Sequence, residues 1–159
     1  MENLRLFLII FAGLTSALTA GIFFTFSTFV MQALGEQTPT SGISTMQSIN
    51  ITVINPWFMT AFFAPVVACL ILVVSFLPQW QETNTIYLVI GGLCYLIGTI
   101  GVTVVGNIPL NDALAVVTPN TTEATMLWSK YLKDWTFWNH VRTIAAFVAS
   151  ILFIRFLNI

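Results

Sequence analysis

The chain has 159 residues, of which 57% are hydrophobic and only 7% are charged, and its net charge is −1. Soluble domains carry about 25% charged residues, so the composition excludes an ordinary water-soluble protein and indicates a surface that faces lipid. No cluster of Lys and Arg exists that could follow a phosphate backbone, which excludes a nucleic-acid partner. Cys69 and Cys94 both lie in apolar runs. We interpret them as small packing residues, although a disulfide or a ligand pair is an alternative.

Four apolar segments are long enough to cross a bilayer, which takes about 20 helical residues. They are predicted to be helices because the backbone must satisfy its own hydrogen bonds in lipid. The predicted spans cover residues 4–34, 57–77, 85–105 and 138–156. The first span runs past any cleavage point for a signal peptide, so we expect it to be retained. The whole chain, residues 1–159, is thus predicted to form a single transmembrane domain.

Small residues recur every four positions in two of these spans. Gly13, Ala17 and Gly21 share one stripe of the first span, and Gly98, Val102 and Gly106 share one stripe of the third. Such stripes let helix backbones approach closely in a membrane. We therefore expect both stripes to lie at helix–helix contacts.

The connection between the first and second spans is predicted to contain an amphipathic helix at residues 41–54. At 100° per residue, its apolar residues share one face of about 140°. These residues are Ile43, Met46, Ile49, Val53 and Ile54. Asn50 lies inside that apolar arc and Gln47 lies at its border. Asn55 and Pro56 then end this helix and start the second span. Residues 78–84 form a short polar turn between the second and third spans.

The last connection is also long and is predicted to contain a helix. A break is expected at Gly106 and Pro109, and a second connector helix is expected at about residues 121–134. Asn120 and Glu123 have the spacing of a capping box at its start. Its apolar stripe consists of Leu127, Trp128, Tyr131, Leu132 and Trp135.

These elements predict an all-α integral membrane four-helix bundle with two interfacial amphipathic connector helices at one end. An even number of spans puts both termini on one side of the membrane and both long connections on the other. The positively charged residues flanking the spans are balanced between the two sides. We expect the termini to be cytoplasmic.

The titratable residues exclude several kinds of catalytic centre. A ferritin-like di-iron site needs about four carboxylates and two histidines on facing helices, whereas His140 is the only histidine and every Asp and Glu lies outside the predicted spans. A bis-histidine haem is therefore excluded, while a haem held by His140 alone stays open. No phosphate-binding loop, HExxH motif or nucleophile elbow occurs. We predict no other metal site.

Arg142 is the most unusual residue because it lies inside the fourth span, about 6 Å deeper than Trp138 along a regular helix. An arginine at mid-bilayer costs about 3 kcal/mol on insertion scales. Either it extends to the lipid headgroups, or it points into the bundle at polar partners or an anionic ligand. Trp135, Trp138, Asn139 and Arg142 share one helix stripe, with spacings of three, four and seven residues. His140 lies about 200° from Arg142, so on a regular helix both cannot face one small pocket.

Two asparagines at the end of the third span are further candidates. Asn107 is still near membrane depth, where a buried amide requires partners. Asn107 and Asn111 can therefore meet the start of the fourth span, although capping and turn formation are alternative roles.

The motifs "GNIPLN" and "WNHVRT", with "MQSIN" and "NPWF" upstream, resemble the family of small integral-membrane proteins named after fungal anthrone oxygenase. The resemblance covers nearly the whole chain. The matching positions are Gln47, Asn50, Asn55, Pro56, Asn107, Pro109, Asn111, Trp138, Asn139 and Arg142. It implies a four-helix membrane bundle and the oxidation of an anthrone to an anthraquinone, and it requires no cofactor.

We therefore weigh two hypotheses for function. The first is a membrane-embedded oxygenase that acts with O₂ on a flat apolar aromatic or quinol-type substrate. Its candidate catalytic residues are Arg142, His140, Asn139 and Asn107, and its candidate substrate-binding residues are Trp135, Trp138, Asn111, Asn50 and Gln47. The second is a non-catalytic protein that binds haem, quinone or lipid in the bundle. Both predict contact with membrane lipids and a hydrophobic small molecule, and we expect the bacterial inner membrane as the location.

Overall fold

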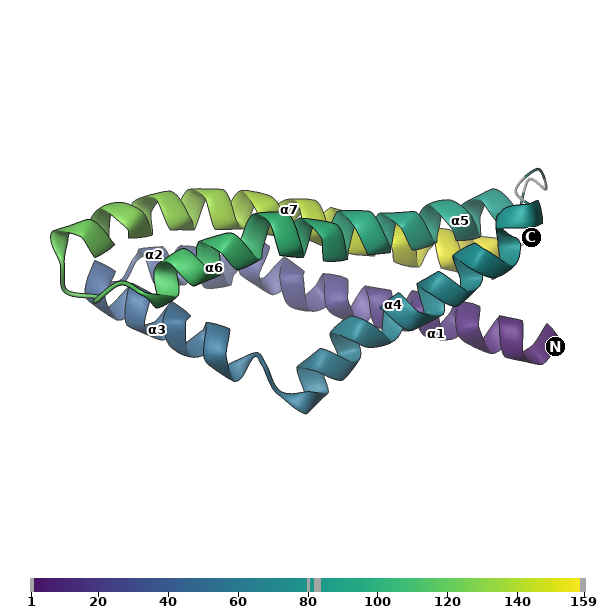
Figure 1. Ribbon diagram of the computed structural model, residues 1–159, viewed down its shortest axis with the longest axis horizontal. Helices are drawn as coiled ribbons and strands as arrows, with labels where there is room; N and C mark the ends of the chain where they lie inside the picture. The colour runs from purple at the N-terminus through teal and green to yellow at the C-terminus, as the bar shows by residue number, and fades with distance from the viewer. Residues whose placement is uncertain (1, 80, 82–83, 158–159) are drawn as a thin grey trace.

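The computed structural model describes residues 2–79, 81 and 84–157, and all regular structure within them is helical (Figure 1). Four helices are long and apolar enough to cross a membrane, which confirms the predicted all-α membrane bundle. They cover Asn3–Gly35, Pro56–Gln79, Thr85–Ala115 and Thr122–Leu157.

Three of the four long helices are compound. The elements in chain order are α1 (Glu2–Thr25), the π-helical η1 (Phe26–Val30), α2 (Met31–Gly35), α3 (Pro39–Thr52), α4 (Pro56–Phe76), the 3₁₀ turn η2 (Leu77–Gln79), α5 (Thr85–Leu93), the π-helical η3 (Cys94–Gly101) and η4 (Thr103–Asn107), α6 (Ile108–Ala115) and α7 (Thr122–Leu157). The first long helix therefore consists of α1, η1 and α2, and the third of α5, η3, η4 and α6. The predicted turn at residues 78–84 falls partly on positions 80, 82 and 83, which lie outside the described residues.

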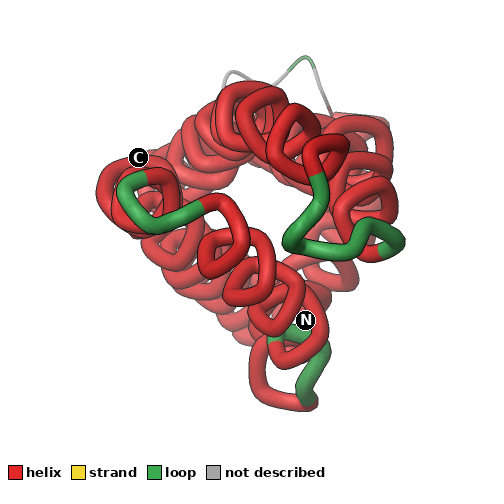
Figure 2. Tube along the Cα trace, turned by 90° about the vertical axis from the view of Figure 1, so that its left-hand side faces the viewer, coloured by secondary structure: helices red, strands yellow, loops and turns green. Residues whose placement is uncertain are grey.

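Both termini lie at one end of the bundle, and both long connections lie at the other, as the even number of spans predicts (Figure 1). Figure 2 shows the helices from the connector end. The 21 residues of α4 extend about 31 Å, which matches the hydrocarbon thickness of a bilayer. The other three long helices have 31 to 36 residues. They therefore continue past the start of α4 and build, with α3, an extension of the bundle at the connector end.

Two separate hydrophobic clusters correspond to these two parts. The terminal cluster contains Ile9, Ala12, Ala20, Ala68, Cys69, Leu72, Phe76, Leu88, Tyr95, Ala146, Ala149 and Phe153. The connector cluster contains Met31, Leu34, Ile43, Met46, Leu114, Ala124, Trp128, Tyr131 and Trp135. The first, third and fourth long helices contribute residues to both clusters. On each of these helices, polar residues lie between the residues of the two clusters.

The second predicted connector helix is not a separate element, because α7 runs without interruption from Thr122 to Leu157. The prediction of a helix at residues 121–134 followed by a distinct span at 138–156 is wrong in this respect. The sequence between Thr122 and Leu157 contains no Pro or Gly. Nothing in the backbone therefore ends the helix where the charged region meets the apolar one.

The predicted break at Gly106 and Pro109 is also absent. Pro109 lies in the first turn of α6, directly after the π-helical η4, and the helix runs through it without a break. The π-helical segments η3 and η4 precede it and widen the helix by changing its hydrogen-bond register. The third long helix therefore continues to Ala115 and carries Asn111 to the connector end.

The connector helix α3 forms nearly as predicted. Thr38 caps it, because its side chain accepts a hydrogen bond from the Ser41 amide, and Pro39 occupies the first turn. Ile43 and Met46 are fully buried, but Ile54 is 71% exposed because the helix ends at Thr52, before it. Ile54 was therefore wrongly placed on the apolar face of this helix, because it lies beyond the end of the helix.

The two stripes of small residues differ in whether they lie at a close helix–helix contact. A Cβ at Gly98 would lie 2.5 Å from the Cβ of Ala145, and one at Gly106 would lie 2.7 Å from the Trp138 ring. The stripe of the third span is thus at a close contact with α7. Gly21 has no neighbour within 4 Å of its added Cβ, so the stripe of the first span was wrongly predicted there.

Gly98→Ala should destabilise the bundle by about 1–3 kcal/mol, because the added methyl group overpacks the contact with Ala145. The measurement is thermal unfolding in detergent. Gly21→Ala is the matched control and should leave stability unchanged or raise it slightly, since alanine favours helix at an open position. Equal melting temperatures for the two variants would contradict the close contact.

Candidate active site

Arg142 is buried inside the bundle, with 6% of its surface exposed. Its Nε donates to Asn139 Oδ1 at 2.9 Å, and its Nη1 donates to Thr103 Oγ1 at 3.4 Å. Its Cζ lies 4.1 Å from the centre of the Phe23 ring and 4.8 Å from that of Trp135. The guanidinium therefore points inward, and the alternative of a headgroup-facing arginine is excluded.

The positive charge is compensated by dipoles and aromatic rings. No Asp or Glu is among the buried residues of the described chain. An amide oxygen, a hydroxyl and two ring faces stabilise the cation instead. A guanidinium has five N–H donors, and two of these bond to described residues. The charge and the remaining donors are thus available to a ligand.

Asn139 holds Arg142 in place and is fully buried. Its Nδ2 donates to the Phe23 carbonyl at 2.8 Å and to Ser27 Oγ at 2.7 Å. Its Oδ1 must therefore face the guanidinium, which fixes the orientation of the amide. One asparagine side chain thus links α7 to both α1 and η1.

These groups belong to a polar layer that separates the two hydrophobic clusters. The layer consists of Ser27, Thr99, Thr103, Asn139, Arg142 and Thr143. Thr99 donates to the Arg142 carbonyl at 3.3 Å, and Thr143 donates to the Asn139 carbonyl at 2.6 Å. The π-helical segments η1, η3 and η4 supply three of its members, consistent with the frequent occurrence of π-helical turns at functional sites.

Beside the layer lies a cavity of about 310 Å³, to which Arg142 contributes the charge. Its lining residues are Ile22, Phe23, Phe26, Met46, Ile49, Asn50, Val53, Ile54, Phe58, Met59, Phe62, Phe63, Thr103, Ile108, Asn111, Trp135 and Arg142. The volume is at the lower end of the range of about 300–1,000 Å³ for ligand sites. Apolar walls with a few polar groups are typical of a site for a small aromatic molecule.

Asn111 forms a second polar group of this cavity. Its Oδ1 accepts hydrogen bonds from Trp135 Nε1 and from the Tyr131 hydroxyl, both at 2.8 Å. Trp135 and Tyr131 are buried, and their rings stack with centroids 6.2 Å apart. Asn111 thus meets α7 at Tyr131 and Trp135, shortly before residue 138, where the fourth span was predicted to start.

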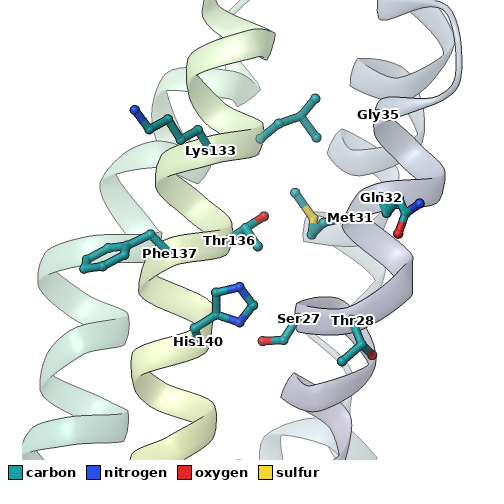
Figure 3. A pocket seen from close by; sticks show the side chains of 10 residues that line it. Ser27, Thr28, Met31, Gln32, Gly35, Lys133, Thr136, Phe137 and His140 are labelled. Atoms are coloured by element: carbon teal, nitrogen blue, oxygen red, sulfur yellow. The ribbon is translucent and has the colours of Figure 1, made fainter.

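His140 lies on the other side of α7, in a groove of about 490 Å³ between α7 and the first long helix (Figure 3). It is exposed, and Ser27, Thr136 and Lys133 line the same groove. The structure thus separates His140 from Arg142, as their 200° separation on a helix predicts. His140 therefore offers no axial ligand for a haem in the aromatic cavity.

The other sequence candidates lie outside the cavity lining. Trp138 packs against Gly106, and Asn107 donates to the Trp135 carbonyl at 3.1 Å. Asn107 Oδ1 is buried and has no partner among the described residues. Gln47 donates to the carbonyls of Leu114 and Val117, and thereby joins α3 to the end of α6. Among the predicted residues, Arg142, Trp135, Asn111 and Asn50 are the ones that line the cavity.

Sequence reasoning missed Thr103 and the phenylalanines of the cavity wall. Phe58 and Phe62 of α4 stack at 5.8 Å, and the Phe23 ring lies 6.1 Å from Phe62. Their spacing of four residues shows that Phe58 and Phe62 share a helix face. The spacing gives no indication of whether this face meets lipid or a cavity.

The family model described as anthrone oxygenase matches residues 58–152, which is more than half of the chain. The chain belongs to the anthrone oxygenase family. Comparisons with the curated proteins and with the solved structures gave no match. The matched region of this family member contains Arg142, Asn139, Asn111 and Trp135, and it ends within α7.

Asn139→Leu should destabilise the protein by about 2–3 kcal/mol, because it leaves the Nε of a buried cation without an acceptor. The measurement is thermal unfolding in detergent, with the neighbouring His140→Ala as the matched control that should change stability by less than about 0.5 kcal/mol. Adding Arg142→Met to Asn139→Leu should recover part of the loss, since the unpaired charge is removed. Additive losses in the double variant would contradict the coupling of the two side chains.

Proposed function

We propose that the cavity binds a flat aromatic ketone with an activated CH₂ group, and that O₂ oxidises this CH₂ while Arg142 holds the ketone oxygen. The observation that supports the proposal is a buried guanidinium with unused N–H donors beside an aromatic cavity. Membership of the anthrone oxygenase family supports anthrone as the representative substrate.

The role of Arg142 follows from the movement of charge in this reaction. When anthrone loses a proton from its CH₂, the negative charge moves across the ring to the ketone oxygen. A cation already fixed in a water-poor site stabilises this oxygen without reorganisation, and such groups typically contribute about 100- to 1,000-fold in rate. Asn139 and Thr103 fix the guanidinium before the substrate enters.

The remaining steps balance with O₂ as the oxidant. The carbanion carbon forms a bond to O₂, and the resulting peroxide takes up a proton. Loss of water from the hydroperoxide, with the second hydrogen of the same carbon, forms the new carbonyl group. One anthrone and one O₂ thus give one anthraquinone and one water, and the four electrons lost by carbon reduce O₂.

The proton from the CH₂ group has no side-chain acceptor in the lining of the cavity. None of the described lining residues is a carboxylate or a histidine, and His140 faces the separate groove. We therefore assign proton removal to water at the mouth of the cavity, with Arg142 increasing the acidity of the bound ketone.

The mouth of the cavity has exposed apolar residues, which suits entry of the substrate from the membrane. Three apolar lining residues are strongly exposed, namely Ile54 at 71%, Phe63 at 49% and Ile108 at 42%. Ile54 lies at the junction of α3 and α4, where the two helices diverge from the bundle (Figure 1). In a bilayer this rim faces lipid, in which anthrones and quinones dissolve.

A second candidate function is the binding of a quinone or a lipid without turnover. The absence of a lining carboxylate or imidazole favours it, because such a protein needs no base. The bacterial inner membrane, with both termini in the cytoplasm, stays our prediction for the location.

Anthrone should cause O₂ uptake by the purified protein, with anthraquinone as the product, and Arg142→Gln should lower the rate at least 100-fold. The matched control is His140→Ala, which should keep the wild-type rate. Met59→Trp tests the cavity independently by filling it, and should also abolish uptake. Uptake that is unchanged in a folded Arg142→Gln variant would refute the role of Arg142, and binding of anthrone without uptake would favour the second candidate function.

The rate of anthrone oxidation should rise with pH up to the pKa of the bound anthrone, because the proton is released reversibly to water and the concentration of the reactive carbanion is inversely proportional to the proton concentration. The profile should be the same for the wild type and for His140→Ala. Stopped-flow absorbance of the product over a range of pH values measures it. A plateau with an apparent pKa near that of histidine, lost in His140→Ala, would show instead that His140 is the base.

A further inference from the structure

Asn111 carries an amide group whose orientation is determined by its neighbours. The indole Nε1–H of Trp135 is a donor only, so the Asn111 atom 2.8 Å from it must be the oxygen. The Tyr131 hydroxyl donates to the same oxygen. The Asn111 NH₂ group is therefore directed away from Trp135 and Tyr131, and it donates to no described residue.

Asn111 and Arg142 line the same cavity, and both contact the indole ring of Trp135. Arg142 Cζ lies 4.8 Å from the centre of the Trp135 ring, and Asn111 is bonded to the Nε1 of that ring. Both residues line the cavity. The cavity is thus lined by two residues with unused N–H donors, and among its described lining residues it has no charged acceptor.

We propose that the Asn111 NH₂ group recognises a second oxygen of the ligand, on the ring position opposite the oxygen held by Arg142. This inference rests on the proposed function and specifies its substrate and product. In this arrangement Arg142 binds the ketone oxygen, and Asn111 lies beside the carbon to which O₂ adds. Asn111 then hydrogen bonds the hydroperoxide and afterwards the new carbonyl oxygen.

The two donors also define the class of ligand. The oxygens of a para-quinone project from opposite edges of one ring, and both accept hydrogen bonds. A molecule of the same shape with an N–H group at the second position would face the Asn111 N–H groups with another donor. One mismatched buried donor typically costs about 1–3 kcal/mol, which is roughly a 5- to 150-fold loss of affinity.

Two tricyclic probes test this directly, because 9,10-anthraquinone has a carbonyl group at the position where acridone has an N–H, and both have the same opposite carbonyl. Acridone fluorescence gives its dissociation constant with the full-length protein in detergent, and competition gives that of anthraquinone. The wild type should bind anthraquinone at least tenfold more tightly than acridone.

Asn111→Asp should reverse this preference. The carboxylate still accepts the hydrogen bonds of Trp135 and Tyr131, so the packing is kept, but it now accepts the N–H of acridone and repels the anthraquinone carbonyl. Asn120→Asp adds the same charge at an exposed position of the same end and should keep the wild-type preference. Arg142→Gln should weaken both probes by a similar factor, since both have the carbonyl it meets.

Two results would overturn the inference. Either the wild type does not prefer anthraquinone over acridone, or Asn111→Asp keeps the wild-type preference. If Asn111→Asp does not fold, Asn111→Leu should abolish the preference, and its retention there overturns the inference as well. Binding selectivity without anthrone turnover would refute the proposed oxygenation and leave the role of Asn111 supported. If the protein oxidises anthrone but Asn111→Asp does not change the selectivity, only the role of Asn111 is refuted.

Discussion

The structure depends on the buried cation of Arg142, which no buried carboxylate of the described residues neutralises. Arg142 is held by Asn139 of its own helix, Thr103 of η4 and the ring faces of Phe23 and Trp135. Removing a guanidinium from water is costly, so these contacts must recover that cost. They draw α1, the third long helix and α7 together at one depth. The residues that stabilise the charge are therefore also the residues that align three of the long helices.

The polar layer explains why the cavity lies where it does. The π-helical segments η1, η3 and η4, which supply three members of the layer, widen the helices at this depth. The short helix α4 begins at this depth and diverges from the bundle, so the space beside Arg142 is closed by phenylalanines. A fixed charge next to an apolar space is the arrangement that stabilises an anionic oxygen most strongly, because little water competes for it.

The sequence was sufficient for the parts of this structure that depend on hydropathy and helical periodicity. Four spans, the shared side of the termini, the amphipathic α3 and the separation of His140 from Arg142 all follow from those two properties. The continuity of α7 was missed because a change from charged to apolar residues resembles a boundary, although no residue stops the helix. The wall formed by Phe58 and Phe62 could not be predicted, since the same spacing suits a lipid-facing surface. Gly21 shows the same limit, because the spacing of small residues does not indicate whether their face of the helix meets another helix.

The exposed rim of Ile54, Phe63 and Ile108 has a consequence for any kinetic description of the protein. A ligand that enters through this rim comes from the two-dimensional phase of the membrane, where apolar aromatics accumulate. The quantity that determines occupancy is then the mole fraction of ligand among the lipids. Adding empty vesicles or detergent micelles dilutes the ligand even when its total amount is constant, so apparent Michaelis constants acquire meaning only when they refer to the lipid phase.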